Sequence, residues 1–194
     1  MTSAQSGARA LVVVDVQNDF VSGTLATDQG AQVAAGISEL LTSAQNSYDL
    51  VVGTLDWHID PAGHFAPEGQ EPDFNETWPV HCVAEQWGSQ PHENLRTEYV
   101  ELWFHKGEYT AAYSGFEAHR VGEKTLLADA LRERGITRID VCGIATDFCV
   151  RATVLDGVQE GFEVTVLQNL CSPVSRANEQ KVLDELAAAG AQIR

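Results

Sequence analysis

The sequence predicts an α/β fold, a three-layer α/β/α sandwich built on a mainly parallel sheet of about six strands. Apolar runs of strand length alternate with helical patterns from residue 10 to the C-terminus, which is the order that successive βαβ units produce. Most of these runs carry Val, Ile or Leu at both odd and even positions, as strands covered on both faces do. The chain has 194 residues and 44% hydrophobic content, which suits one compact domain over residues 1–194.

The strand candidates are short apolar runs, of a length more typical of strands than of helices. In chain order they are ALVVVDV (10–16), DLVVGTLD (49–56), VELWFHK (100–106), RIDVCGI (138–144), FEVTVLQ (162–168) and a short AQIR (191–194).

Helical patterns separate the strands, and several close with Gly at the C-cap position. They cover AAGISELLTSAQN (34–46), LLADALRERG (126–135), ATDFCVRATVLDGVQEG (145–161) and SRANEQKVLDELAAAG (175–190). Residues 57–99, in contrast, are rich in Pro, Gly, His and Trp and show no clear periodicity. A loop of that length inside a compact domain is usually functional, so we expect it to carry part of a site.

Composition excludes several classes of partner. Acidic residues outnumber basic ones by 28 to 12, and the net charge of -16 repels phosphate backbones and anionic lipids, so we expect neither a nucleic-acid nor a membrane partner. No apolar stretch approaches the roughly 18 residues that cross a bilayer, and the first ten residues lack the pattern of a signal peptide. Four cysteines without a CxxC pair indicate free thiols. We expect a cytoplasmic protein; whether it is a monomer or a homo-oligomer stays open.

Polar residues at strand ends are the first candidates for chemistry, because ligands of doubly wound sheets bind outside the carboxyl ends of the strands. Asp15 follows the run LVVV, although a single acidic residue there is as often a helix cap. Lys106 follows VELWFH, and its ammonium can stabilise a thiolate or a carboxylate. Cys149 lies where a strand gives way to a helix, whose start lowers a thiol pKa and can hold an oxyanion. Its alternative role, a small buried hydrophobe, suits Cys142 better.

The segment DWHIDPAGHF indicates a metal site. Asp56 and His58 are two residues apart and face the same side of an extended segment, while a turn at residues 61–63 can bring His64 back to them. His81 follows in WPVHC. Imidazole and carboxylate ligands together suit Zn, Fe or Mn. Four such groups in one loop-rich segment favour a metal over four unrelated surface or core residues.

Five motifs, VVVDVQNDF, DWHIDPAGHF, WPVHCV, FHKGEYTAAYSGFE and GIATDFCVRAT, run along nearly the whole chain. In order and approximate spacing they resemble the isochorismatase-like cysteine hydrolases, and within them the nicotinamidases and pyrazinamidases. The resemblance implies the isochorismatase-like hydrolase fold. It also implies hydrolysis of a small-molecule substrate, nicotinamide and also pyrazinamide, to the carboxylic acid and ammonia, in NAD salvage.

In that family an Asp, a Lys and a Cys form the catalytic triad, and the matching positions are Asp15, Lys106 and Cys149. The resemblance implies a thioester mechanism in which the Cys attacks the amide carbon, the Asp moves the proton and the Lys holds the charges in place. It further implies an oxyanion hole made by the backbone amides of Ala145 and Cys149, and a cis peptide bond between Ile144 and Ala145.

The metal ligands of the nicotinamidases match Asp56, His58, His64 and, in the bacterial pyrazinamidases, His81. The resemblance therefore implies one divalent ion, Zn, Fe or Mn, that engages the ring nitrogen of the substrate directly or through bound waters. It implies no organic cofactor.

A flat heteroaromatic ring is best held by aromatic and apolar faces. The candidate pocket walls are Phe20, Leu25, Trp78, Tyr113 and Ile144, each of which can equally be ordinary core. One position departs from the resemblance, because Phe148 stands before Cys149 where close pyrazinamidase relatives often carry His. We expect this departure to affect substrate affinity or preference, since it removes no triad or metal position.

Two other functions stay open. One is another hydrolase on the same scaffold, such as an isochorismatase or a carbamoyl amidohydrolase, which the DWHIDPAGH cluster disfavours because those relatives lack a metal there. The other is a catalytically silent interaction module, which the intact Asp15, Lys106 and Cys149 disfavour.

Overall fold

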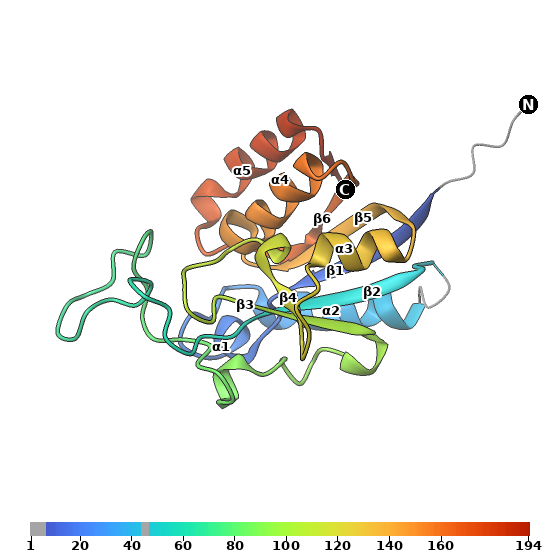
Figure 1. Ribbon diagram of the computed structural model, residues 1–194. Coiled ribbons are helices and arrows are strands. Elements are labelled where there is room, and N and C mark those ends of the chain that lie inside the picture. The colour runs from blue at the N-terminus through green and yellow to red at the C-terminus, as the bar shows by residue number, and fades with distance from the viewer. Residues whose placement is uncertain (1–6, 44–46) are drawn as a thin grey trace, which may run out of the picture.

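The computed structural model describes residues 7–43 and 47–194, which form a seven-stranded sheet with helices on both faces (Figure 1). The strands are β1 (Ala8–Val14), β2 (Leu50–Asp56), β3 (Leu102–Lys106), β4 (His119–Arg120), β5 (Ile136–Ile144), β6 (Glu163–Ser172) and β7 (Gln192–Ile193). The helices are α1 (Asn18–Val21), α2 (Gly30–Ser43), α3 (Leu127–Glu133), α4 (Arg151–Gln159) and α5 (Arg176–Ala189). The predicted α/β/α sandwich is confirmed. Among the helices described, none is long and apolar enough to span a lipid bilayer.

The sheet has the order β4-β3-β2-β1-β5-β6-β7, and every neighbouring pair is parallel except β3 and β4. The chain thus builds the sheet outward from β1 through β2 and β3, and then returns to the other side of β1 with β5. The strand order reverses at β1, and ligands of such sheets bind outside the carboxyl ends of the strands at the point of reversal. The ends of β1 and β5 are therefore where a site is expected.

Alternate residues of β1 face opposite layers of the sandwich. Val12 and Val14 pack in the core beneath α3, α4 and α5, whereas Leu11 and Val13 pack on the other face, against Ile37 of α2. Figure 1 shows α4 and α5 on one side of the sheet and α2 on the other. Burial on both faces is the reason that apolar residues occupy both parities of this strand.

The structure departs from the predicted elements in a few places. The additional strand is β4, whose two residues are too few to show a period of two in the sequence. The helix predicted over residues 145–161 begins with a π-helical turn, Thr146–Val150, before α4. Helix α2 begins at Gly30, earlier than predicted, and residues 44–46 of that prediction lie outside the described residues.

The connection between β2 and β3 is the long irregular segment that the sequence predicts. It contains short 3-10 helices at Trp87–Ser89 and Thr97–Tyr99, and isolated bridges such as that between Phe65 and Trp78. In Figure 1 its teal and green course extends away from the end of the sheet. The loop therefore lies beside the carboxyl ends of the central strands.

One buried carboxylate ties the central strands together. Asp140 of β5 is 1% exposed. It accepts hydrogen bonds from Arg9 Nε at 3.0 Å and from the Tyr48 hydroxyl at 2.8 Å, and a second guanidinium nitrogen of Arg9 contacts it as well. Burial and the bond to Asp140 raise the pKa of Tyr48 above its ordinary value. This carboxylate therefore connects β1, β5 and the segment that leads into β2.

Replacing Asp140 by Ala would leave the guanidinium of Arg9 half-buried without its partner. We expect Asp140→Ala to lower the free energy of unfolding by about 3 kcal/mol, because removing one member of a buried ion pair is costly. Urea unfolding followed by circular dichroism measures this change. Glu123→Ala is the matched control, since the ion pair of Glu123 with Arg120 is exposed and such pairs contribute about 1 kcal/mol or less. Equal losses in the two variants would contradict the assigned role.

Candidate active site and metal centre

Functional side chains converge at the carboxyl ends of the central strands. Asp15 follows β1, Asp56 ends β2, Lys106 ends β3, and Cys149 lies in the π-helical turn after β5. The parallel register sets Asp56 opposite Lys106, and the backbone N–H of Asp15 donates to the carbonyl of Thr54 at 3.1 Å. All four functional side chains are buried. The register of the parallel strands therefore brings these side chains to the same end of the sheet.

Lys106 joins the predicted triad. Its Nζ lies 2.8 Å from Asp15 Oδ2 and 3.5 Å from Cys149 Sγ, and it also contacts Oδ1 of Asp56. On its far side, Asp15 accepts a hydrogen bond of 2.7 Å from the Thr54 hydroxyl. The structure thus brings Asp15, Lys106 and Cys149 together, and it adds Asp56 to the same charge cluster.

Burial and the buried ammonium of Lys106 together set the pKa values of this cluster. Burial alone lowers the pKa of Lys106, but Asp15 and Asp56 outweigh it and hold that pKa well above its ordinary value. Burial alone raises the pKa of Asp56, yet Lys106 and the nearby imidazoles hold it below its ordinary value. For Asp15, burial outweighs the attraction of Lys106 and raises the pKa. Asp15 is therefore the carboxylate of this cluster that takes a proton more readily.

The Cys149 thiol differs from the expectation of a lowered pKa at a helix start. Burial raises its pKa well above the ordinary value, and the attraction of Lys106 does not offset that effect. The resting side chain is therefore a neutral thiol, which needs a base to become a nucleophile. Asp15, Asp56 and Cys149 each offer one atom within 4.8 Å of the other two. Asp15 is thus close enough to serve as that base.

The backbone before Cys149 approaches β1 closely. The peptide bond between Ile144 and Ala145 is cis, as the resemblance implies. Gly143 has φ 121°, and a Cβ there would lie 2.0 Å from the carbonyl oxygen of Val14. Only glycine permits this approach. Ala145 and Cys149 border the same pocket, beside which an oxyanion hole is expected.

Three histidines meet beside Asp56. His58, His64 and His81 each present a ring nitrogen within 4.8 Å of the other two. Oδ2 of Asp56 lies 3.7 Å from His58 Nε2 and 3.9 Å from His81 Nε2. The structure therefore brings together all four predicted ligands, while Asp56 also contacts Lys106 through its other oxygen.

The donors fit a divalent metal ion. His58 Nδ1 bonds to the carbonyl of Gly107 at 2.7 Å, which leaves Nε2 as the free nitrogen of the ring. Within the described part of the chain, buried His58 Nε2 and His64 Nδ1 have no hydrogen-bond partner. Burial lowers the pKa of His64 to about 4 and also lowers the pKa of His81, so both are neutral at neutral pH. Neutral imidazoles with buried free nitrogens are what a metal ion requires.

Backbone hydrogen bonds of the irregular loop place two of these ligands. The N–H of His58 donates to the carbonyl of Cys82 at 3.0 Å, and the N–H of Ala84 donates to the carbonyl of His58 at 2.8 Å. The stretch around His58 therefore runs alongside the stretch that follows His81. The side chain of His81 is fixed in turn, because its Nδ1 bonds to the carbonyl of Pro79 at 2.7 Å.

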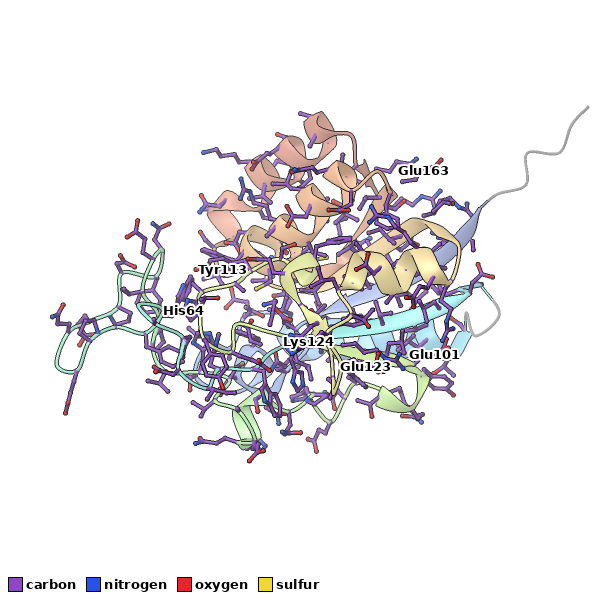
Figure 2. The ribbon with its side chains drawn as sticks, viewed as in Figure 1. His64, Glu101, Tyr113, Glu123, Lys124 and Glu163 are labelled. Atoms are coloured by element: carbon purple, nitrogen blue, oxygen red, sulfur yellow. The ribbon has the colours of Figure 1, made fainter. Side chains whose placement is uncertain are left out.

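The predicted turn at residues 61–63 places the third ligand. The N–H of His64 donates to the carbonyl of Pro61 at 3.0 Å, and Gly63 has φ 74°. The carbonyl of His64 then accepts from the N–H of Trp78 at 2.9 Å. The ring centroids of His64 and Tyr113 are 5.9 Å apart. Figure 2 shows both residues at the end of the molecule from which the loop extends.

A pocket opens over the nucleophile and the histidines. Its walls are mostly aromatic and apolar with a few polar groups, which is the lining that small-molecule sites have. The lining residues are Phe20, Leu25, Asp56, His64, Trp78, His81, Tyr113, Ala145, Phe148, Cys149 and Val174. The predicted walls are thus present, with the exception of Ile144.

Ile144 does not line the pocket. It is still part of β5, and its side chain is fully buried in the core on the α2 face. Phe148 lines the pocket instead, edge-on to Trp78 with ring centroids 4.8 Å apart and 6.0 Å from the ring of Tyr113. Trp78 Nε1 donates to the Tyr113 hydroxyl at 3.0 Å. These three rings form an aromatic wall that the sequence predicted only in part.

Some supporting residues were not predicted. Gly107 has φ 75°, and a Cβ there would lie 2.7 Å from Cε1 of His58. Gln17 and Asp19 are buried polar residues. The side chain of Gln17 bonds to the backbone of Asp56, and that of Asp19 bonds to the backbone of Cys82, which follows His81. The available signal was the polar run QND directly after an apolar strand.

Comparison with known proteins agrees with this geometry. A family model described as the Isochorismatase domain matches residues 9–194. A nicotinamidase/pyrazinamidase of Mycobacterium tuberculosis is 45% identical over 187 residues, which cover 95% of this chain and 97% of that protein.

Two solved structures have the same fold. PnC1 from L. infantum in complex with nicotinate matches with a TM-score of 0.82 and 32% identity, over 100% of this chain and 95% of that one. The pyrazinamidase of Pyrococcus horikoshii in complex with zinc matches with a TM-score of 0.79 and 33% identity, over 96% and 98%. The chain therefore belongs to the isochorismatase family, and the relatives that it resembles within that family are nicotinamidases and pyrazinamidases.

Proposed function

We propose that this protein is a nicotinamidase, a single-domain amidohydrolase that cleaves nicotinamide, and also pyrazinamide, to the carboxylic acid and ammonia. The observation that carries the proposal is the position of Lys106 Nζ, in contact with Asp15, Asp56 and Cys149 beside the pocket. A nucleophile, a base and a charge that organises both are the parts that acyl transfer needs. The Mycobacterium tuberculosis relative supports the substrate.

In the first half of the proposed reaction, Cys149 Sγ attacks the amide carbon while its proton passes to Asp15. Backbone N–H groups of Ala145 and Cys149 stabilise the charge that develops on the amide oxygen. Asp15 then gives the proton to the amide nitrogen, the C–N bond breaks and ammonia leaves. Lys106 stays charged throughout and favours the ionised forms beside it. A thioester to Cys149 remains.

In the second half, water releases the acid. Asp15, ionised again, takes a proton from water, and the water oxygen attacks the thioester carbon. The C–S bond then breaks and Asp15 returns the proton to the sulfur of Cys149. The product leaves as nicotinic acid and ionises to nicotinate by losing the remaining proton of the water to solvent. The enzyme regains the neutral thiol that its buried position favours.

Asp56, His58, His64 and His81 would hold one divalent ion. The ion is Zn, Fe or Mn, because imidazole and carboxylate ligands accept all three; the zinc complex of the Pyrococcus horikoshii pyrazinamidase supports such an ion. When bound, it supplies a Lewis-acidic centre for the ring nitrogen of the substrate. The four-ligand cluster favours this reaction over those of metal-free hydrolases on the same scaffold.

The test of this function is ammonia release from nicotinamide and pyrazinamide by the purified protein. We expect turnover of both amides by the metal-loaded protein and loss of turnover after chelation. Absence of turnover with both amides in metal-loaded protein would refute the proposal. Turnover that survives complete metal removal would instead indicate a metal-free hydrolase.

Cys149→Ala removes the sulfur that forms the acyl-enzyme. We expect it to abolish ammonia release while the protein still folds and binds metal, because the thiol lies outside the histidine cluster. Mass spectrometry of the wild type quenched during turnover should show the nicotinoyl adduct on Cys149. The buried Cys142 gives the control, since Cys142→Ala should keep activity. Near-normal turnover in Cys149→Ala would rule out the covalent mechanism.

His58→Ala removes one metal ligand. We expect the metal content of the purified protein, measured by inductively coupled plasma mass spectrometry, to fall from about one ion per chain to a small fraction, because three of the four predicted ligands remain and hold the ion weakly. His119→Ala is the control, since His119 is partly exposed, faces Glu108 and is not among the clustered ligand candidates of the described residues. An unchanged metal content in His58→Ala would exclude His58 as a ligand.

Phe148→Ala opens the aromatic wall. We expect KM for nicotinamide to rise by about fivefold to tenfold with little change in kcat, because one aromatic contact contributes about 1 kcal/mol and Phe148 takes no part in the chemistry. Phe148→Tyr keeps the ring and should behave like the wild type. Steady-state kinetics of both variants measure KM and kcat. An unchanged KM in Phe148→Ala would show that Phe148 does not contact the substrate.

A further inference from the structure

Three consecutive polar residues after β1 are largely buried and do not take part in the proposed chemistry. Gln17, Asn18 and Asp19 are 0%, 7% and 8% exposed. Their side chains all bond to backbone groups of distant segments, Gln17 to residues 56 and 89, Asn18 to residue 87 and Asp19 to residue 82. Buried polar side chains are kept where their hydrogen bonds fix a specific arrangement.

Gln17 fixes the backbone of one metal ligand from both sides. Its Oε1 accepts from the N–H of Asp56 at 2.9 Å, and its Nε2 donates to the carbonyl of Asp56 at 2.8 Å. The same Nε2 donates to the carbonyl of Ser89 at 2.8 Å. The amide of Gln17 therefore holds Asp56 in place at the end of β2 and joins it to the far part of the loop.

Asp19 bonds to the backbone of Cys82, the residue whose backbone connects the ligands His81 and His58. Its Oδ2 accepts from the N–H of Cys82 at 2.7 Å. Cys82 directly follows His81, and its carbonyl accepts from the N–H of His58 at 3.0 Å. Cys82 also has φ 45°, a left-handed conformation that is unfavourable for a residue with a side chain. One carboxylate thus holds the backbone that sets the spacing between His58 and His81.

The surrounding chain is shaped to admit this carboxylate. A Cβ on Gly88 would lie 2.0 Å from Oδ2 of Asp19, and a Cβ on Gly23 would lie 2.3 Å from Oδ1. The N–H of Thr24 donates to Oδ1 at 3.2 Å. Asp19 therefore occupies a slot between two glycines, where its position is narrowly fixed.

We propose that Gln17 and Asp19 are positioning residues for the metal site, which set the arrangement of Asp56, His58 and His81 through the backbone. The inference rests on the proposed metal centre. Partners that orient metal ligands typically change metal affinity by 10-fold to 100-fold when they are removed. Asn18 does not share this role, because its side chain bonds to the carbonyl of Trp87 at 2.7 Å, and Trp87 adjoins no ligand.

The experiment compares Co²⁺ binding to Gln17→Met, Asp19→Ala and Asn18→Ala with binding to the wild type. Metal-free protein is titrated with Co²⁺ against a chromophoric chelator, and the visible absorption of bound Co²⁺ reports the ligand geometry. We expect Kd to rise at least tenfold, with an altered spectrum, in the first two variants. Asn18→Ala loses a contact of the same loop and should keep Kd within about twofold.

Urea unfolding of each metal-free variant separates ligand positioning from general loosening of the loop. Asn18→Ala breaks one side-chain hydrogen bond and Gln17→Met breaks three. We therefore expect Asn18→Ala to lower the free energy of unfolding by less than Gln17→Met, and to keep the spectrum of the wild type. Two variants of smaller change complete the set, and Asp19→Asn also replaces Asp19→Ala if that variant fails to fold. Gln17→Glu keeps the acceptor for Asp56 but loses both donated bonds, and should weaken Co²⁺ binding. Asp19→Asn keeps one acceptor for Cys82 and should recover most of the affinity.

Unchanged Co²⁺ affinity and an unchanged spectrum in Gln17→Met and Gln17→Glu would overturn the proposal for Gln17. If Asn18→Ala weakened Co²⁺ binding as much as the other variants, the distinction between positioning residues and other buried polar residues of this run would be wrong. A wild-type protein that does not bind Co²⁺ would overturn the metal centre itself. Failure of the metal centre is distinguishable from failure of the positioning role, because it appears in the titration of the wild type, before any variant is compared.

Discussion

The site depends on one buried ammonium. Lys106 is 2% exposed and lies among two carboxylates and a thiol. An isolated charge at that depth would be strongly unfavourable, and two buried carboxylates without a cation would repel each other. Each charged group is therefore stable at that depth only because the opposite charge lies beside it. The parallel register that sets Asp56 opposite Lys106 is thus a condition for both the fold and the proposed chemistry.

Much of this arrangement could be predicted from the sequence, because the patterns involved are local. Continuous Val, Ile and Leu runs identified the central strands, and the polar residues at their ends made Asp15, Asp56 and Lys106 candidates. The triad itself came from the resemblance to the isochorismatase-like cysteine hydrolases. The spacing of Asp56 and His58, with the turn at residues 61–63, predicted that these two residues and His64 come together in a metal cluster. In each case the backbone geometry of a few neighbouring residues decides where the side chain lies.

The features that were not predicted depend on contacts between distant segments. The pKa of Cys149 is set by how completely other layers cover it, and burial outweighs the effect of the helix start. Ile144 was expected in the pocket, but its side chain packs among residues of the core on the α2 face of the sheet. The roles of Gln17 and Asp19 become visible only when their partners at residues 56, 82 and 89 are known.

The place of the site at the reversal of strand order has a consequence for folding. Asp15 and Cys149 meet only because β1 and β5 pair in parallel, although well over a hundred residues separate them along the chain. Pairing of segments so far apart is slow, since the intervening chain must lose much of its conformational freedom first. No fragment that lacks β5 contains both the base and the nucleophile. Recovery of catalysis during refolding therefore reports the completion of the central sheet and not the formation of any local element.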